Sequence, residues 1–391
     1  MGKTVNFFDH PYYKLTKTMT SLVGQWPHQS TKELVIYRSC LFVIISLQLT
    51  PQFIAVYTYR NDLKILLDTL SPFLVDAILI AKFVNNCFHS RTLIHLLDLI
   101  EENWIIFPRT NGQQLLHYHS ELCRKASILY LGAVYFGTFS FATEPIQRKL
   151  LYPLIYGNVT VEKTFAMPME FSSLLDVDYW YYPILLISTG FIFVFMTVVG
   201  SCDLLLFLYS EHAVGLFQGL RYAIEHLPPH NKSERSDFGF EYLKCCAAIH
   251  SRAIYFAEQV RDIYLWTFFA VIGLNMIMMS ITGVQVVINQ DAIEKVIKYA
   301  IFVVMQSVHL FVECYAAQRL MDASYEVKES LTNSAWYDAT KKTQKLLPLM
   351  LMRSQSPIVL TAGKIIAMNM DTYAVVLKTA ASYFTLFLAI Q

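Results

Sequence analysis

The stretch Tyr179–Cys202, YWYYPILLISTGFIFVFMTVVGSC, decides the fold class, because it contains no Asp, Glu, Lys or Arg. At about 1.5 Å of rise per residue, a helix of this length crosses roughly 30 Å of hydrocarbon. Three further stretches are free of the same charged residues: Ser39–Tyr59, Ala126–Thr143 and Ile263–Gln290. The sequence therefore predicts an integral membrane protein.

Three more apolar stretches carry charge. Leu66–Val84 contains two Asp and one Lys, Val296–Gln318 contains one Lys and one Glu, and Gly363–Ile390 contains two Lys and one Asp. With these we predict an all-α membrane protein that forms a single seven-helix domain over residues 1–391. The expected spans are 37–59, 66–84, 126–145, 179–208, 263–290, 296–318 and 361–390.

The composition supports this class and argues against others. Apolar residues make up 55% of the chain and charged residues 16%, against roughly 25% charged residues in soluble domains. The net charge of +1 and the lack of a basic stripe argue against nucleic-acid binding. No HExxH, GxxxxGK[ST], GxSxG or CxxC motif occurs, so we expect no enzyme activity, cofactor or metal.

The orientation follows from the basic residues near the last span. Lys341, Lys342, Lys345, Arg353 and Lys364 precede that span and none follows it. Because basic residues favour the cytosolic side, we expect the N-terminus inside and the C-terminus outside.

Two glycosylation sequons flank the fourth span, at Asn158 and Asn231. They lie on opposite sides of the membrane, and the expected orientation makes Asn158 the one that is modified. The loop 145–182 is then extracellular, and it is long enough to fold over the outer mouth of the bundle.

The inside connections are long and helical in pattern. Apolar positions between Phe238 and Arg261 recur at helical spacing. We therefore expect the fourth to sixth helices to continue into the cytosol and to form, with residues 335–358, a small helical anchor domain. The last helix ends with the chain, which leaves no expected cytosolic tail.

Aromatic and small residues fill the outer halves of several spans. Where they converge, they would form a mostly apolar pocket with a few polar groups, the character of a small-molecule site; each alone also fits helix packing. The candidate ligand-binding residues are Phe73, Ala77, Phe136, Gly137, Ser140, Phe141, Ile187, Phe191, Tyr299, Phe302 and Gln306.

Charges within the spans are costly and mark functional candidates. Lys82 is expected to extend to the cytosolic interface, and Glu313 to pair with a neighbour. Asp371 and Lys378 share one side of the last helix, where they line a water-filled path or pair at a helix interface. Leu386 and Ile390, four residues apart, fit either lipid contact or a hydrophobic constriction.

The C-terminal third resembles the insect odorant receptor family. The resemblance rests on Trp336-Tyr337, on LPLMLMRSQ at 347–355 followed by Pro357, on Ala362-Gly363, and on Thr372-Tyr373. Leu377-Lys378 and the closing Ser382–Thr385 complete this ordered set. Pro11-Tyr12-Tyr13 and Leu22–Pro27 resemble the family's N-terminal segment.

The resemblance implies a subunit of an odorant-gated, non-selective cation channel. It implies a heterotetramer with the shared odorant co-receptor in the plasma membrane of a sensory-neuron dendrite. The odorant then binds among the second, third, fourth and sixth helices, and the last helix lines a pore for cations. By this resemblance Leu386 and Ile390 form the constriction, and Lys378 also belongs to the pore helix. The long second intracellular insertion of the co-receptor is missing, so the chain resembles a tuning receptor.

Two other receptor classes remain as alternatives. A gustatory-type receptor belongs to the same channel superfamily, but its closing motif differs from Ser382-Tyr383 followed by Gln391. A G-protein-coupled receptor has seven helices too, but here the D/E-R-Y and N-P-x-x-Y motifs are missing and the expected orientation is reversed.

Overall fold

The computed structural model describes residues 7–106, 111–157, 163–171, 176–227, 238–290 and 292–390. In this part of the chain, each of the seven expected spans overlaps one long helix. The seven helices are α2 (Thr31–Thr58), α3 (Leu63–Phe88), α5 (Asn111–Ala142), α7 (Val177–Glu225), α8 (Phe238–Ile288), α9 (Ile293–Asn333) and α11 (Met370–Ile390).

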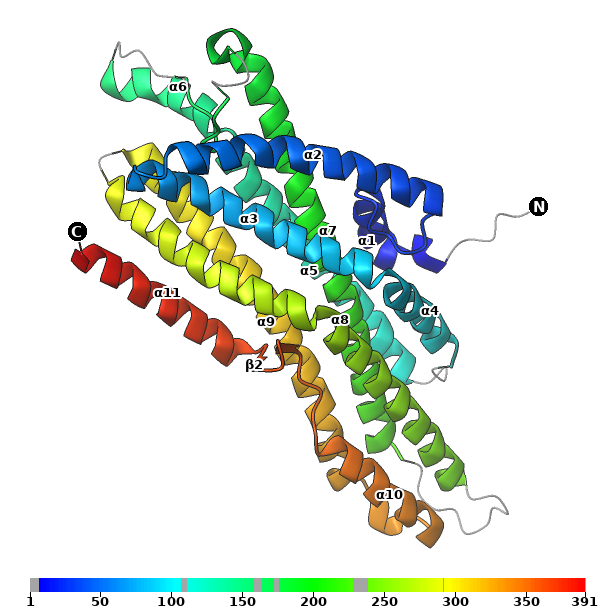
Figure 1. Cartoon of the computed structure of the whole chain (residues 1–391). Helices are drawn as coiled ribbons and strands as arrows, with labels where there is room; N and C mark the ends of the chain where they lie inside the picture. The colour runs from blue at the N-terminus through cyan, green and yellow to red at the C-terminus, as the bar shows by residue number, and fades with distance from the viewer. Residues whose placement is uncertain are drawn as a thin grey trace.

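The remaining elements are short and connect or extend these helices. They are a 3-10 turn (Phe7–Asp9), α1 (Pro11–Leu22), α4 (Ser90–Ile106), α6 (Glu144–Tyr156), a second 3-10 turn (Trp336–Asp338), α10 (Lys341–Ser354), β1 (Thr361–Ala362) and β2 (Ile366–Ala367). Figure 1 shows the arrangement, with α6 at one end of an elongated bundle and α10 at the other.

Length and hydropathy separate the helices into two groups. Within the described ranges, α2, α7, α8 and α9 are long and apolar enough to cross a membrane, and α5 joins them if it forms one span with α6, to which it is bent by 54°. In helix α3, the charged residues Lys64, Asp68, Asp76 and Lys82 are spread along most of the length. A helix with so many charges needs protein around them.

Polar side chains fix where several helices begin. Ser30 and Glu33 form a reciprocal capping box at α2. Asp62 and Asp176 accept backbone hydrogen bonds at the starts of α3 and α7. These caps satisfy amide groups that the first helical turn leaves without a partner.

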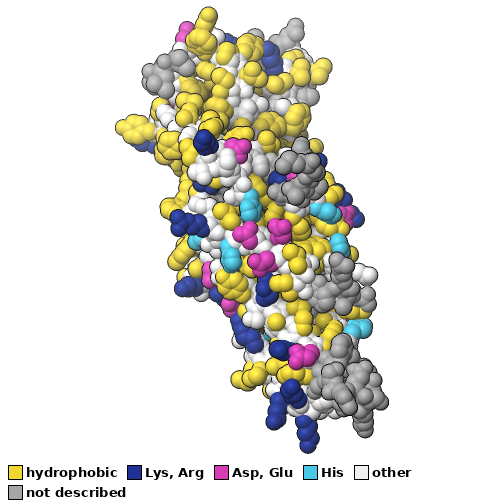
Figure 2. Space-filling model, turned by 90° about the vertical axis from the view of Figure 1, so that its right-hand side faces the viewer, with side chains coloured by type: hydrophobic (Ala, Val, Ile, Leu, Met, Phe, Trp, Pro, Cys, Tyr) yellow, Lys and Arg dark blue, Asp and Glu magenta, His cyan; other side chains and the backbone are white. Residues whose placement is uncertain are grey.

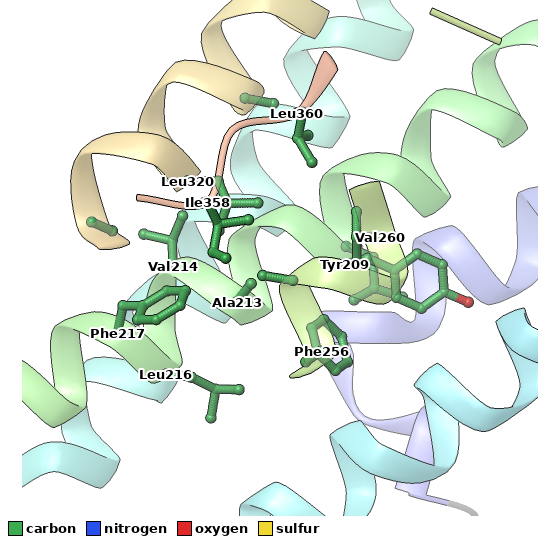
Figure 3. Packing of buried hydrophobic residues seen from close by; sticks show 14 of the residues in the cluster. Tyr209, Ala213, Val214, Leu216, Phe217, Phe256, Val260, Leu320, Ile358 and Leu360 are labelled. Atoms are coloured by element: carbon green, nitrogen blue, oxygen red, sulfur yellow. The ribbon is translucent and has the colours of Figure 1, made fainter. Parts of the chain in front are cut away.

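The three longest helices, α7, α8 and α9, form the backbone of the bundle. Helix α7 is buried without interruption from Val198 to Phe217, so it is surrounded by protein rather than by lipid. Figure 3 shows its Tyr209 and Phe217 in the core, with Phe256 of α8 and Leu320 of α9.

Helix α10 packs against α8 and α9, as Figure 1 shows. Leu347 and Met350 of α10 are buried, and Arg353 pairs with Glu258 at 2.7 Å. We call the α10 bundle the assembly of α10 with 209–225 of α7, 238–260 of α8 and 319–333 of α9. It corresponds in position to the expected anchor domain.

The expected last span began too early. Residues 361–367 form a β-hairpin instead, and α11 starts only at Met370. Gly363 and Lys364 both have positive φ, of 61° and 64°, the backbone of a tight hairpin turn that interrupts a helix. The third span also ends earlier than expected, because α5 stops at Ala142.

On one face of the molecule (Figure 2), apolar and charged side chains separate along the long axis. Figure 2 shows a face on which apolar side chains dominate towards the α6 end, whereas Lys and Arg side chains gather at the α10 end. This separation is the pattern of a membrane protein with one basic, water-exposed end.

Candidate functional site

A cavity of about 130 Å³ lies between α3, α5, α7, α8 and α9. It sits on the side of the bundle away from α10, since it uses the first part of α9 and the last part of α5. Most of its wall is apolar, from Val75, Val134, Phe141, Ile192, Phe195, Met278, Ile301, Phe302 and Met305. The volume is below the roughly 300–1,000 Å³ of pockets for drug-sized ligands, so only a small molecule fits.

Part of the connection between α6 and α7 covers this cavity. Met167 is buried and lines it. The amides of Gln48 and Gln52 on α2 donate hydrogen bonds to its sulfur, at 2.9 and 2.8 Å. Lys298 of α9, which also lines the cavity, donates to the carbonyl of Ala166 at 2.6 Å. The connection therefore lies over the bundle, as the length of the loop 145–182 suggested.

Four of the eleven candidate ligand residues line the cavity: Gly137, Phe141, Phe302 and Gln306. Gly137 lies against the flexible side chain of Met305 on α9, since a Cβ there would lie 2.7 Å from Cγ of Met305. Phe141 and Phe302 form a ring pair with centroids 5.5 Å apart. These residues come from the third and sixth expected spans.

The other seven candidates lie outside this lining. Phe136 and Ile187 are exposed on the outer surface of the bundle. Phe73 packs edge-on against Phe53 of α2, and Tyr299 donates a hydrogen bond to Asp68. The rest are Ala77, Ser140 and Phe191, which are partly buried. Helical phase explains the difference, since neighbouring residues of one helix point about 100° apart.

The sequence did not single out several lining residues. The fifth span contributes Asn275 and Met278, whereas we expected the second, third, fourth and sixth spans. Asp76 of α3 lines the cavity as well. The sequence shows that Asp76 is a charged residue within a span, but the direction in which its side chain points depends on the packing of five helices.

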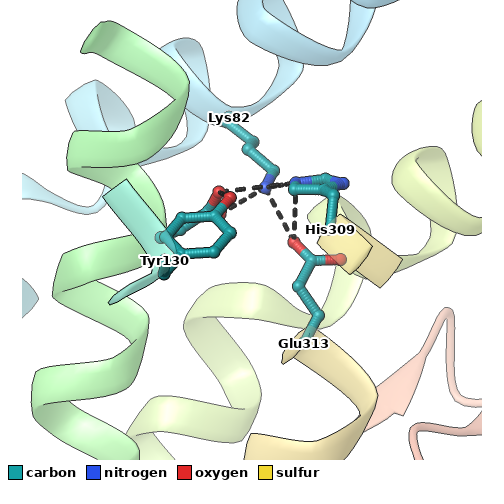
Figure 4. Close-up of polar contacts among 5 residues, drawn as sticks. Lys82, Tyr130, His309 and Glu313 are labelled. Carbon is teal, nitrogen blue, oxygen red and sulfur yellow. Dashed lines mark hydrogen bonds and ion pairs between the residues drawn. The ribbon is translucent and has the colours of Figure 1, made fainter. Parts of the chain in front are cut away.

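A buried cluster of charged side chains lies next to the cavity (Figure 4). Lys82 of α3 binds Asp203 of α7, and its Nζ lies 2.7 Å from Oε1 of Glu313 on α9. His309 and Tyr130 belong both to this cluster and to the cavity lining. Tyr130 donates to the other carboxylate oxygen of Asp203 at 2.5 Å, and Nε2 of His309 lies 2.7 Å from Nζ of Lys82.

This cluster corrects one expectation and confirms another. Lys82 does not extend to the cytosolic interface, because it is 3% exposed and two carboxylates hold it inside the bundle. Glu313 does pair with a neighbour, which is Lys82. A buried ammonium is stable only with such partners.

The same cluster includes a group of metal-ligand type. Ligand atoms of Asp203, His309 and Glu313 lie within 4.8 Å of one another. The ammonium of Lys82 already bonds to all three, so it occupies the place that a metal cation would need.

Helix α9 connects the cavity to α11. Ser307, one residue after the cavity-lining Gln306, hydrogen-bonds Tyr373 of α11 at 2.8 Å between their hydroxyl oxygens. Phe311 packs edge-on against the same tyrosine, with centroids 5.5 Å apart. A displacement of α9 at the cavity would therefore act directly on α11.

The candidate pore residues lie on the outer side of the bundle. Leu386 is 54% exposed, and Asp371 and Lys378 are exposed as well. Ile390 closes α11, but its side chain lies outside the described residues, as do Asn158 and Asn231. In a single chain, this exposed face of α11 is free to meet lipid or further subunits.

The seven cysteines are all free thiols.

Comparisons with known proteins identify relatives of the whole chain. Odorant receptor 82a of Drosophila melanogaster is 25% identical over 365 residues, which cover 90% of this chain and 91% of the relative. Odorant receptor 67c of the same species is 24% identical over 316 residues, or 76% and 72% of the two chains.

Solved structures share the fold. The insect olfactory receptor OR5 from Machilis hrabei, solved in complex with eugenol, matches with a TM-score of 0.78, 14% identity and 97% coverage of each chain. A second structure of the same receptor matches with a TM-score of 0.75. These matches confirm the seven-helix membrane fold.

The family model described as 7tm Odorant receptor matches residues 62–381. This match favours an odorant receptor over the gustatory-type and G-protein-coupled alternatives, and it confirms that the chain is a multi-pass membrane receptor rather than an enzyme. The chain belongs to the 7tm odorant receptor family.

Proposed function

We propose that this chain is the odorant-binding subunit of a ligand-gated, non-selective cation channel, and that the cavity between α3, α5, α7, α8 and α9 holds the odorant. The observation that carries the proposal is a small, mostly apolar cavity whose wall helix α9 bonds directly to α11. Aromatic and aliphatic walls bind a volatile molecule mainly through burial of its apolar surface.

The proposal includes a heterotetramer with co-receptor subunits. Each subunit contributes α11 to a central pore, in which Leu386 and Ile390 form the hydrophobic constriction and Lys378 faces the same path. The exposed side chains of Leu386 and Lys378 support this arrangement, since the described residues of the single chain leave this face of α11 uncovered. The α10 bundle is the part that we expect to hold subunits together.

We further propose a cytosolic N-terminus and an extracellular, glycosylated Asn158, in the plasma membrane of a sensory dendrite. Epitope tags at each terminus and a glycosidase shift in wild type and in Asn158→Gln test this topology. A glycan on Asn231 instead of Asn158 would show that the chain has the opposite orientation in the membrane.

The experiment that tests the function is a current recording from cells that express this chain with the co-receptor. We expect a volatile panel to evoke cation currents that cells with co-receptor alone do not show. Leu386→Ser should raise basal leak, because a polar side chain eases hydration of the constriction. Val376→Thr is the control: Val376 lies on the same helix but is 3% exposed within the bundle, so its variant should keep the basal current. Unchanged leak in Leu386→Ser would place that residue in lipid.

A further inference from the structure

The cavity contains polar atoms that lack partners within the described part of the chain. They are Oδ2 of Asp76, both amide atoms of Asn275 and Oε1 of Gln306. The three residues are 4%, 0% and 5% exposed and come from α3, α8 and α9. A buried polar atom without a hydrogen bond is costly, so these atoms are available to hydrogen-bond a molecule that enters the cavity.

The orientation of the Gln306 amide follows from its neighbour. The hydroxyl of Thr282 donates to the carbonyl of Met278 at 2.7 Å, so its oxygen can only accept further bonds. The amide nitrogen of Gln306 supplies one at 3.2 Å. Because its amide nitrogen is engaged in this way, Gln306 offers its Oε1 to the cavity as a hydrogen-bond acceptor.

Several other polar groups of the lining are already engaged. Thr138 donates to the carbonyl of Val134 at 2.8 Å, Tyr130 donates to Asp203, and Lys298 donates to Ala166. The unpartnered set therefore consists of three oxygen acceptors and one amide donor. A molecule that matches it must donate a hydrogen bond and accept one.

We propose that the odorant of this cavity carries a hydroxyl group, as an alcohol or a phenol does, and that Asp76, Asn275 and Gln306 bind this hydroxyl. A hydroxyl donates one bond and accepts others, which matches the mixed set. An ether or an ester has no donor for the three acceptors. An ammonium group has no acceptor for the amide of Asn275, and the wall already contains the ammonium of Lys298. The inference rests on the proposed function and specifies its ligand class.

The first test uses wild-type channel and pairs of isomers. Small primary alcohols are each compared with the isomeric methyl ether, which has the same size and a similar apolar surface. We expect the alcohol to act at an effective concentration about tenfold lower, the effect of one well-placed hydrogen bond. Equal effective concentrations across the pairs would overturn the inference while leaving the odorant-gated channel intact.

The second test removes the polar groups one at a time. Asn275→Leu and Gln306→Met nearly preserve volume, and each should reduce the preference for alcohol over ether while the channel still responds to the ether. Met278→Leu is the matched control, since Met278 lines the same cavity from the same helix as Asn275 without a hydrogen bond to the ligand. It should shift the alcohol and the ether together and keep their ratio.

The outcomes separate the two proposals. If both polar-group variants keep the full alcohol preference, the hydroxyl is bound elsewhere and the inference is wrong. If one variant fails to reach the cell surface, the other variant and the alcohol–ether pairs on wild-type channel still test whether the hydroxyl is bound here. If wild-type channel responds to no volatile at all, the proposed function itself fails, and the inference fails with it.

Discussion

Helices α7, α8 and α9 run through both ends of the molecule, the end with the cavity and the end with α10. The two ends pack differently. In the α10 bundle, Phe217 and Phe256 are fully buried, and the charged pair Arg353 and Glu258 lies partly exposed at its surface. At the other end, these helices enclose a cavity together with α3 and α5, and both amide atoms of Asn275 and Oε1 of Gln306 have no partner among the described residues. The cavity of about 130 Å³ lies among buried side chains of five helices, whereas the α10 bundle holds a wider and more open groove of about 470 Å³ between α8 and α10.

The cavity lowers the stability of the folded chain relative to a fully packed core. A partly polar cavity makes fewer dispersion contacts and hydrogen bonds within the protein than a close-packed core. The stretch of α7 from Val198 to Phe217, which is buried without interruption, supplies close packing that offsets this loss. The buried cluster around Lys82 lies beside the cavity and connects α3, α7 and α9.

The largest effect is expected from breaking this cluster. Lys82→Met leaves Asp203 and Glu313 buried without their cation, and removal of one partner of a buried ion pair costs about 3–5 kcal/mol. We expect a strongly lowered melting temperature of the detergent-purified channel and little protein at the cell surface.

The control for Lys82→Met is an ion pair of the α10 bundle that faces water. Arg221 contacts Glu326 at 2.8 Å but its side chain is 40% exposed, so Arg221→Met should cost about 0–1 kcal/mol. Equal effects of the two variants would mean that the cluster is solvated in the assembled channel.

A pair of glycine variants compares the two ends directly. Gly137→Leu extends a side chain towards Met305, which can move into the cavity. We expect surface expression to stay normal and the effective odorant concentration to rise about tenfold, because the cavity is filled. Gly215→Leu at the other end meets Leu116 and His119 in closed packing, where overpacking costs about 1–3 kcal/mol.

Dose–response curves and melting temperatures separate these two outcomes. The comparison fails if Gly137→Leu keeps wild-type sensitivity across a size series of ligands, since Gly137 then does not border the odorant. It also fails if Gly215→Leu is as stable as wild type.

The smallest effect concerns pH and the α10 bundle. Burial, and secondarily the nearby Arg353, lower the pKa of His250 to about 4, below the roughly 6.5 of a free histidine. As pH falls below about 6.5, the unfolded chain binds a proton that the folded chain does not. Stability is therefore full above that pH and declines towards acid, by about 1 kcal/mol between pH 7 and pH 5.5.

Melting temperatures across this pH range measure the effect. His250→Gln should flatten the dependence, because the glutamine does not titrate. A wild-type curve that is as flat as that of the variant would show that His250 is protonated without cost.

The sequence by itself determined the class and the order of the fold. Charge-free stretches such as Tyr179–Cys202 must be helices in a bilayer, because lipid offers no partner to backbone amides. The motif around 347–355 pointed to the family that the comparisons then confirmed. The helical pattern of 238–261 predicted that α8 continues beyond the membrane.

Only the tertiary structure decided which residues meet. The sequence around Lys82 does not distinguish a lysine that reaches water from one that binds Asp203 and Glu313, which are distant in sequence. The direction of Phe136 and Phe141 on one helix differs by their phase, so one faces outward and the other lines the cavity. The start of α11 depends on a hairpin whose Gly363 bonds the carbonyl of Leu265. Hydropathy reports how apolar a segment is, but the rotation of each helix and the partners of each buried charge follow from packing among all of them.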